Sequence, residues 1–291
     1  MECTYNQVDP QYETNQGLNY RLSVLLCQDG FLFLVTHVLS HQVLKIASYK
    51  LGHDDVKYNG LAGWPVNAYE YFSLIRKIDF LHLSYRQVDI AIASFKIATA
   101  PQEFFTPSNT LDLVSATHSV NPDDEILVEP IFDRGPAIAI LIPGYVRENC
   151  MRLFPGAKLR SAPAVFVKGV MRNHSQLISR QVFINIYREY FEITVIQGER
   201  LLYLNAFRYS APSDVLYYVI FVLEQLGFVP SEQDVTLMGN VAQSSAIAEE
   251  LKMYCGSLHF AGCPEALHYN EAFNDVAMHQ YFTLLNIPLC E

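Results

Sequence analysis

QVFINIYREYFEITVIQGERLLYLNAF, residues 181–207, consists of three short segments rich in β-branched and aromatic residues. Residues of these types favour strands, and a tight turn containing Gly198 separates the second segment from the third. The segments at 181–188, 190–197 and 200–207 therefore predict an antiparallel meander of three strands.

The residues after the meander predict a helix and then a strand, a helix and a strand. Residues 212–226 place apolar side chains at helical spacing, with Ser213 or Asp214 as the N-cap and Gly227 as the stop. The three remaining elements are expected at 234–238, 244–255 and 258–261.

Residues 20–94 give the same order of elements. Two alternating apolar segments, 20–27 and 31–38, flank Asp29-Gly30, and Asp-Gly between such segments is a strong hairpin signal. A strand, a helix and a buried strand are then expected at 42–51, 65–81 and 87–94. The chain therefore carries a structural repeat, although the residues of the two halves differ.

This order predicts an α/β protein with two domains. Residues 1–19 are polar and are expected to form a flexible arm. The first domain is expected at 20–175, with an inserted subdomain at about 95–135, and the second at 176–291. The inserted block is expected to contain strands at 95–101, 125–132 and 137–142 and a helix at 108–116. A helix at 275–285 is expected to pack on the second domain.

Composition narrows the classes of function. The 291 residues are 51% hydrophobic, which is enough for a large core, and the formal net charge is −10. Nucleic-acid grooves and anionic membrane surfaces attract clustered cations, so this charge argues against both as partners. No apolar run approaches the length of a membrane span, and the first 19 residues lack the features of a signal peptide. We expect a cytoplasmic protein without membrane insertion.

Three segments of the sequence resemble a bacterial family of unknown function, domain-of-unknown-function family 3822. They are FKIATAPQEFF (95–105), LLYLNAFRYSAPSDVLYYVIFVLEQLG (201–227) and VTLMGN (235–240). The layout resembles the actin-like ATPase superfold, and within it the type IV pilus and cell-division actin-like proteins. The resemblance implies two ribonuclease-H-like domains with mixed five-stranded sheets of order βββαβαβ, with a small subdomain inserted in the first.

Actin-like ATPases place Asp-x-Gly at the first hairpin of each half, because the carboxylate holds Mg²⁺ and the glycine lets the backbone approach the phosphates. The resemblance puts the second of these motifs on Asn185-Ile186-Tyr187, where the charge and the glycine are both replaced. The remnant nucleotide cleft would consist of Asp29, Gly30, Asn185, Tyr187, Gly239 and Asn240. Hairpin chemistry at Asp29-Gly30 and helix capping at Gly239 are the alternative interpretations.

These departures predict a non-catalytic pseudo-ATPase with no catalytic residue, no metal ligand and no cofactor. It would act through a protein partner or through self-association. The alternative is a nucleotide-binding ATPase or sugar-kinase-like phosphotransferase with divergent phosphate loops, which would use ATP with Mg²⁺. A third hypothesis, a small metabolite in the interdomain cleft, is compatible with both.

Two further groups of residues leave alternatives open. The tyrosines of the second half can belong to the core, to a protein interface or to a ligand pocket; they are Tyr187, Tyr190, Tyr203, Tyr209, Tyr217 and Tyr218. The acidic residues of the inserted block favour a solvated face, with a weak cation site as the alternative; they are Asp112, Asp123, Asp124, Glu125 and Glu129.

Overall fold

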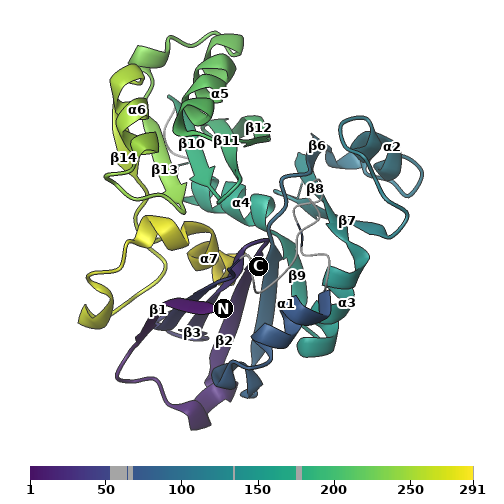
Figure 1. Cartoon of the computed structure of the whole chain (residues 1–291), viewed down its shortest axis with the longest axis vertical. Helices are drawn as coiled ribbons and strands as arrows, with labels where there is room; N and C mark the ends of the chain where they lie inside the picture. The colour runs from purple at the N-terminus through teal and green to yellow at the C-terminus, as the bar shows by residue number, and fades with distance from the viewer. Residues whose placement is uncertain (53–63, 65–67, 134, 175–178, 291) are drawn as a thin grey trace.

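The computed structural model describes residues 1–290 except 53–63, 65–67, 134 and 175–178. It confirms the predicted α/β class. Two sheets lie one above the other, and a smaller sheet stands beside them (Figure 1).

The first domain is built on a six-stranded sheet of order β1-β4-β3-β2-β5-β9. Its strands are β1 (Glu2–Val8), β2 (Tyr20–Cys27), β3 (Gly30–His37), β4 (Val43–Lys50), β5 (Gln87–Ile92) and β9 (Lys158–Ser161). Strands β2, β5 and β9 are parallel, whereas β3 pairs antiparallel with β2 and β4. Because side chains alternate along a strand, Leu22, Val24 and Leu26 enter one core and Leu25 and Cys27 the other.

The second domain is built on a five-stranded sheet of order β12-β11-β10-β13-β14. Its strands are β10 (Arg180–Ile186), β11 (Tyr190–Gln197), β12 (Arg200–Arg208), β13 (Val235–Gly239) and β14 (Leu258–Phe260). This order corresponds to β4-β3-β2-β5-β9 of the first sheet, so the predicted repeat is confirmed.

Helices α5 (Pro212–Gln225) and α6 (Ala246–Tyr254) cover one face of the second sheet. Helix α5 lies in the expected range, but the predicted N-cap at Ser213 or Asp214 is wrong, because Ala211 is the N-cap. Asp214 is the third helical residue, and its carboxylate accepts the backbone N–H groups of Ser210 and Ala211. Gly227 follows the helix with φ +72°, a conformation that glycine adopts without strain.

The inserted block forms a three-stranded sheet of order β6-β8-β7 with one helix beside it. Its elements are β6 (Ile97–Pro101), α2 (Thr110–Ser115), β7 (Asp124–Pro130) and β8 (Pro136–Pro143). Strand β7 lies at the edge of this sheet, a position that tolerates Pro130, which has no N–H group to donate. The block extends to Pro143, beyond the expected limit near 135, because β8 is its central strand.

The predicted flexible arm at residues 1–19 is wrong. Strand β1 pairs antiparallel with β4, and a 3-10 helix at Thr14–Asn19 leads into β2. Thr4 Oγ1 also hydrogen-bonds to Ser48 of β4. Strand β4 would otherwise leave its backbone groups unpaired at the sheet edge, and β1 satisfies them. The first sheet therefore has six strands where five were expected.

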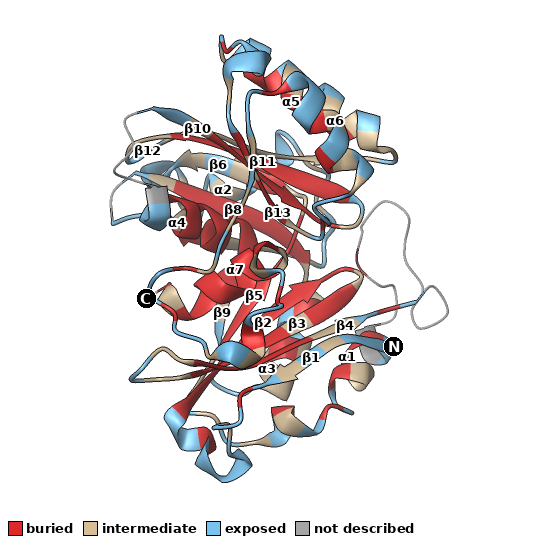
Figure 2. Ribbon diagram, turned by 90° about the vertical axis from the view of Figure 1, so that its left-hand side faces the viewer, coloured by how far each residue is buried: buried red, intermediate tan, exposed pale blue. Residues whose placement is uncertain are grey.

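Four helices complete the first domain and the space between the sheets: α1 (Ala68–Ile75), α3 (Gly144–Leu153), α4 (Ala162–His174) and α7 (Phe282–Asn286). Residues 65–67 of the helix expected at 65–81 lie outside the described residues. Helices α4 and α7 lie between the two large sheets and are largely buried (Figure 2).

The expected helix at 275–285 is divided into a 3-10 turn (Met278–Tyr281), α7 and a second 3-10 turn (Ile287–Leu289). Helix α7 packs on α4, β2 and β3 as well as on β13, so it does not belong to the second domain alone. Among the described residues, no helix has the length and apolar character that a membrane crossing requires.

Candidate functional site

One cavity of about 340 Å³ between the two domains brings together all six residues expected at the nucleotide cleft. Asp29 and Gly30 come from the β2–β3 hairpin, Asn185 and Tyr187 from the end of β10, and Gly239 and Asn240 from the end of β13. The structural repeat explains this convergence, because the ends of the equivalent strands β2 and β10 face each other across the gap.

Sequence reasoning missed the other walls of the cavity. They are formed by Thr4 and Tyr5 of β1, Ser48, Tyr49 and Lys50 of β4, and Gln280, Tyr281 and Thr283 near α7. The rings of Tyr5 and Tyr281 lie 5.8 Å apart at their centroids. The cavity therefore depends on strand β1, whose residues were expected to be unstructured.

Two stacked tyrosines fill the turn of the second hairpin. The rings of Tyr187 and Tyr190 lie 4.5 Å apart and nearly parallel, with an interplanar angle of 13°. Both side chains are buried, and the Tyr187 N–H donates to the carbonyl of Tyr190 at 2.9 Å. Tyr209 Oη donates to the carbonyl of Tyr187 at 2.7 Å and fixes this turn further.

The two hairpin tips approach each other closely. Cys27, Gln28 and Asp29 face residues 187–190 across a gap of about 10 Å³. A cavity of roughly 10–15 Å³ is the least that holds one water molecule. In this conformation the gap has no room for a phosphate group.

Asp29 lines this gap and is half-buried. Burial raises the pKa of Asp29, while the positive charges of Arg188 and Lys50 oppose the rise. The first hairpin closes through the pair Cys27 and Gly30, so Gln28-Asp29 forms the two-residue turn and Gly30 already belongs to β3. The predicted hairpin is present, but its turn lies one residue earlier than the expected Asp-Gly turn, and Gly30 is not part of it.

Asn185 takes part in a buried polar network on β10. Its Nδ2 atom donates to Glu192 Oε2 at 3.0 Å and to Thr283 Oγ1 at 3.3 Å. Burial raises the pKa of Glu192 to about 8, and the hydrogen bond from Asn185 opposes the rise. Glu192 was not singled out from the sequence, although an acidic residue inside an otherwise apolar strand is a signal of a special environment.

Gly239 has a backbone reason to be glycine. Its φ is +85°, and an added Cβ atom would lie 2.2 Å from the carbonyl oxygen of Ile186. The helix that follows starts only at Ala246, where Ser245 Oγ accepts the Ala248 N–H. Gly239 is therefore explained by the close approach of β13 to β10, and helix capping is not its role.

The tyrosines of the second half divide between core and surface. Tyr187 and Tyr190 are buried, whereas Tyr217 on α5 is 63% exposed and Phe221, four residues on, is 45% exposed. Tyr218 stacks on Phe207 at 4.6 Å and contacts Tyr217 at 5.2 Å, so an aromatic ridge runs from the sheet to the surface.

The acidic residues of the inserted block also divide. Asp124 pairs with Lys96, and Glu125 with Arg147 near the surface. Glu129 is buried and pairs with Arg160 and Lys168, which a solvated face does not explain. No group of three His, Cys, Asp or Glu side chains comes together as a metal site within the described residues.

The fold is shared with solved structures. A Bacteroides thetaiotaomicron protein with actin-like ATPase fold and unknown function matches with a TM-score of 0.75 and 18% identity, over 94% of this chain and 99% of that one. A chain of the PilM-PilN type IV pilus biogenesis complex matches with a TM-score of 0.64 and 10% identity, over 92% of this chain and 97% of that one. No curated protein matches this sequence. At these identities the likeness shows the actin-like ATPase fold.

A family model covers most of the chain. The model described as "Protein of unknown function (DUF3822)" matches residues 9–258, which include both hairpins and the ends of β10 and β13. The chain therefore belongs to the DUF3822 family, whose fold is that of the actin-like ATPases.

Proposed function

We propose that this protein is a pseudo-ATPase that acts by binding another protein or further copies of itself. The observation that carries the proposal is the filled gap between the hairpins, where Tyr187 stacks on Tyr190 beside Asp29. Phosphoryl transfer depends on positioned phosphates and Mg²⁺, and the resemblance to actin-like ATPases places them at these hairpins. Asn185, in the position of the second carboxylate, is engaged with Glu192.

Two observations support the binding role. The aromatic ridge ends in the exposed rings of Tyr217 and Phe221, which lie 6.3 Å apart. Tyrosine and phenylalanine rings are enriched at protein interfaces, because they bury a large area at a small cost in conformational entropy. The PilM-PilN assembly, whose matched chain has this fold, is itself a complex of proteins.

Thermal unfolding with millimolar ATP or ADP, with and without Mg²⁺, tests the first part of the proposal. A ligand at one hundred times its Kd stabilises a protein by roughly 2.7 kcal/mol, which gives a clear rise in Tm. We expect no rise. A rise that grows with Mg²⁺, together with Mg²⁺-dependent ATP turnover, would contradict the proposal.

A second candidate function is binding of a nucleotide or another small anion in the cavity. Its volume of about 340 Å³ lies within the usual range of ligand sites, and both Lys50 and Arg188 line it. The same thermal unfolding and turnover measurements separate the two candidate functions, because a nucleotide that binds without hydrolysis raises the Tm but is not consumed. Lys50→Met would then abolish the rise.

The binding role is tested on the aromatic ridge. We expect Tyr217→Ala combined with Phe221→Ala to reduce self-association in a sedimentation concentration series, or to reduce recovery of a partner from the source cell. Tyr254→Ala is the matched control, since Tyr254 is 51% exposed on α6. Equal behaviour of the double variant and the control would exclude the ridge as the interface.

A further inference from the structure

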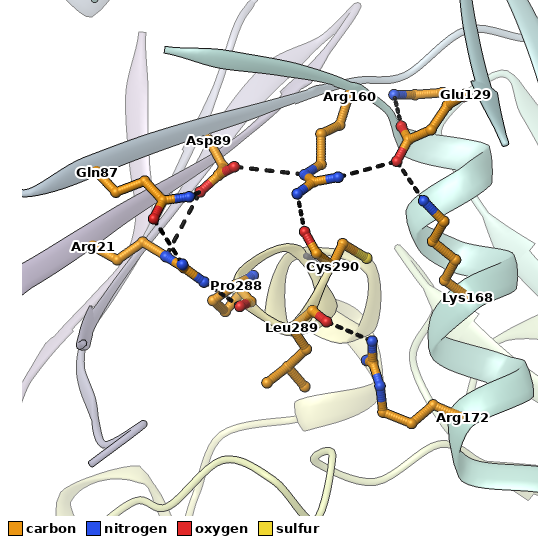
Figure 3. Close-up of polar contacts among 11 residues, drawn as sticks. Arg21, Gln87, Asp89, Glu129, Arg160, Lys168, Arg172, Pro288, Leu289 and Cys290 are labelled. Carbon is orange, nitrogen blue, oxygen red and sulfur yellow. Dashed lines mark hydrogen bonds and ion pairs between the residues drawn. The ribbon is translucent and has the colours of Figure 1, made fainter. Parts of the chain in front are cut away.

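Three arginines bind the main chain of residues 288–290. Arg21 of β2 donates to the carbonyl of Pro288, Arg172 of α4 to that of Leu289 at 2.6 Å, and Arg160 of β9 to that of Cys290 (Figure 3). Three successive backbone carbonyls are thus held by three guanidinium groups, whatever side chains these residues carry.

Two of the three arginines, Arg21 and Arg160, are themselves held by buried carboxylates. Asp89 of β5 lies 3.5 Å from Arg160 Nε and 3.7 Å from Arg21 Nε. Glu129 of β7 lies 3.2 Å from Arg160 Nη1 and 2.7 Å from Lys168 Nζ. The part of the carbonyl site formed by Arg21 and Arg160 is therefore held by the first sheet, the inserted block and Lys168 of α4.

The same segment is attached to the second domain at its other end. His279 Nε2 donates to the carbonyl of Val241 at 2.8 Å, and Thr283 Oγ1 accepts from Asn185 of β10. Gln280, Tyr281 and Thr283 also line the interdomain cavity. Residues 279–290 therefore run from the second domain, along the cavity wall, to the arginines of the first.

Helix α7 joins the part of the segment that contacts the second domain to the part that the arginines bind. Thr283 lies on this helix together with Asn286, whose Oδ1 atom accepts from Arg172 Nη1 at 3.2 Å. Asn286 also packs directly on Gly169 of α4, where an added Cβ would lie 2.5 Å from the Asn286 Cγ atom. A single apolar cluster includes Cys27 and Tyr187 of the cavity as well as Ile287 and Cys290.

We propose that residues 279–290 form a latch between the domains, and that release of Pro288–Cys290 from the three arginines widens the cavity. Closing of the latch places Thr283 and Tyr281 in the cavity wall, and its release removes them. The width of the cavity is then governed by the arginine site that binds the residues after α7. This inference does not depend on which function the cavity or the aromatic ridge has.

The chain carries its own probes for this motion. Cys290 reports on the latch and Cys27 on the cavity, and both are buried, as are Cys150 and Cys255 in the cores of the two domains. Cys3 is exposed and gives the reference rate. Labelling of the full chain with a thiol reagent, followed site by site by mass spectrometry, should modify Cys290 and Cys27 together and before Cys150 and Cys255.

The variant Arg172→Ala tests the coupling, because Arg172 is exposed and its loss leaves no buried charge unpaired. Loss of its hydrogen bonds should raise the labelling rates of Cys290 and Cys27 by about tenfold each, since bonds to charged groups are the stronger ones. Arg147→Ala, which removes an exposed arginine paired with Glu125, is the matched control and should change neither rate.

Three outcomes would overturn the proposal. A rise at Cys290 alone would mean that the segment frays locally without opening the cavity. Unchanged rates at both sites would mean that the arginines do not govern the motion. An equal rise at Cys150 and Cys255 would mean that the molecule unfolds as one unit and has no separate latch.

Discussion

Glu192 makes the stability of the protein depend on pH. Its pKa is about 8 in the folded state, where it is fully buried, against an ordinary value of 4.5. Between these values the folded state binds a proton that the unfolded state lacks, so stability falls as the pH rises through this range. One pKa unit corresponds to about 1.4 kcal/mol, which makes the loss a few kcal/mol.

The variant Glu192→Gln should remove this dependence, since the amide keeps a hydrogen-bonding group but cannot ionise. We expect urea unfolding at pH 5 and pH 9 to show a clearly smaller loss of stability in the variant than in the wild type. Glu249→Gln, on the exposed side of α6, serves as control. An unchanged difference between the two pH values would show that Glu192 is not the responsible group.

Gly239 is the second residue whose role can be tested alone. Because its φ is +85° and a Cβ would contact the carbonyl of Ile186, Gly239→Ala should destabilise the protein by roughly 1–3 kcal/mol. Gly262→Ala is the control, since nothing lies within 4 Å of the Cβ position there. Thermal unfolding of both variants gives the comparison, and equal Tm values would refute the steric argument.

At the scale of the elements, strands with an apolar pattern could be predicted from the sequence, whereas the polar strand β1 could not. The segments 20–27 and 190–197 each have one face made mostly of apolar residues, and their strands were found with the same limits. Strand β1 reads ECTYNQV and is almost wholly exposed, so no pattern separates it from a loop. Its structure comes from the free edge of β4, which local sequence does not reveal.

The candidate site was predictable where it follows from the repeat. Asp29 and Asn185 lie at equivalent strand ends, and the two halves bring them to one cavity. Tyr5, Tyr281 and Thr283 come from opposite ends of the chain, and no short-range pattern connects them. Their contribution depends on tertiary packing.

The N-cap of α6 offers a test at this scale. Ser245 Oγ accepts the Ala248 N–H at 3.3 Å, so Ser245→Ala should cost about 1 kcal/mol of stability. Ser244→Ala, one residue earlier and outside the cap, should cost little. Chemical unfolding measures both, and an equal cost would show that the cap does not stabilise the helix.

At the scale of the whole molecule, the arrangement of the last helix was predicted incorrectly. The apolar face of residues 275–285 shows that the segment is buried, but an apolar face fits more than one partner. Helix α7 lies between the sheets, where Phe282, Leu284 and Leu285 are buried in the apolar clusters and the arginines of the first domain hold the residues that follow.

Arg160 is the central residue of that arrangement. It is 4% exposed and joins Asp89, Glu129 and the carbonyl of Cys290. Arg160→Met should lower the stability by roughly 3–5 kcal/mol, because two buried carboxylates then lose a partner. Arg147→Met is the exposed control. Similar urea midpoints for the two variants would mean that the buried network contributes little.

The hydrogen bond between Arg160 and Cys290 also has a consequence for synthesis in the cell. The two residues are 130 positions apart, and at 5–20 residues per second the ribosome needs roughly ten seconds to make the chain between them. During that time Arg21, Asp89 and Arg160 have been translated but lack the main chain that completes their network. The nascent first domain is therefore expected to remain incompletely folded and accessible to chaperones until residues 288–290 leave the ribosome.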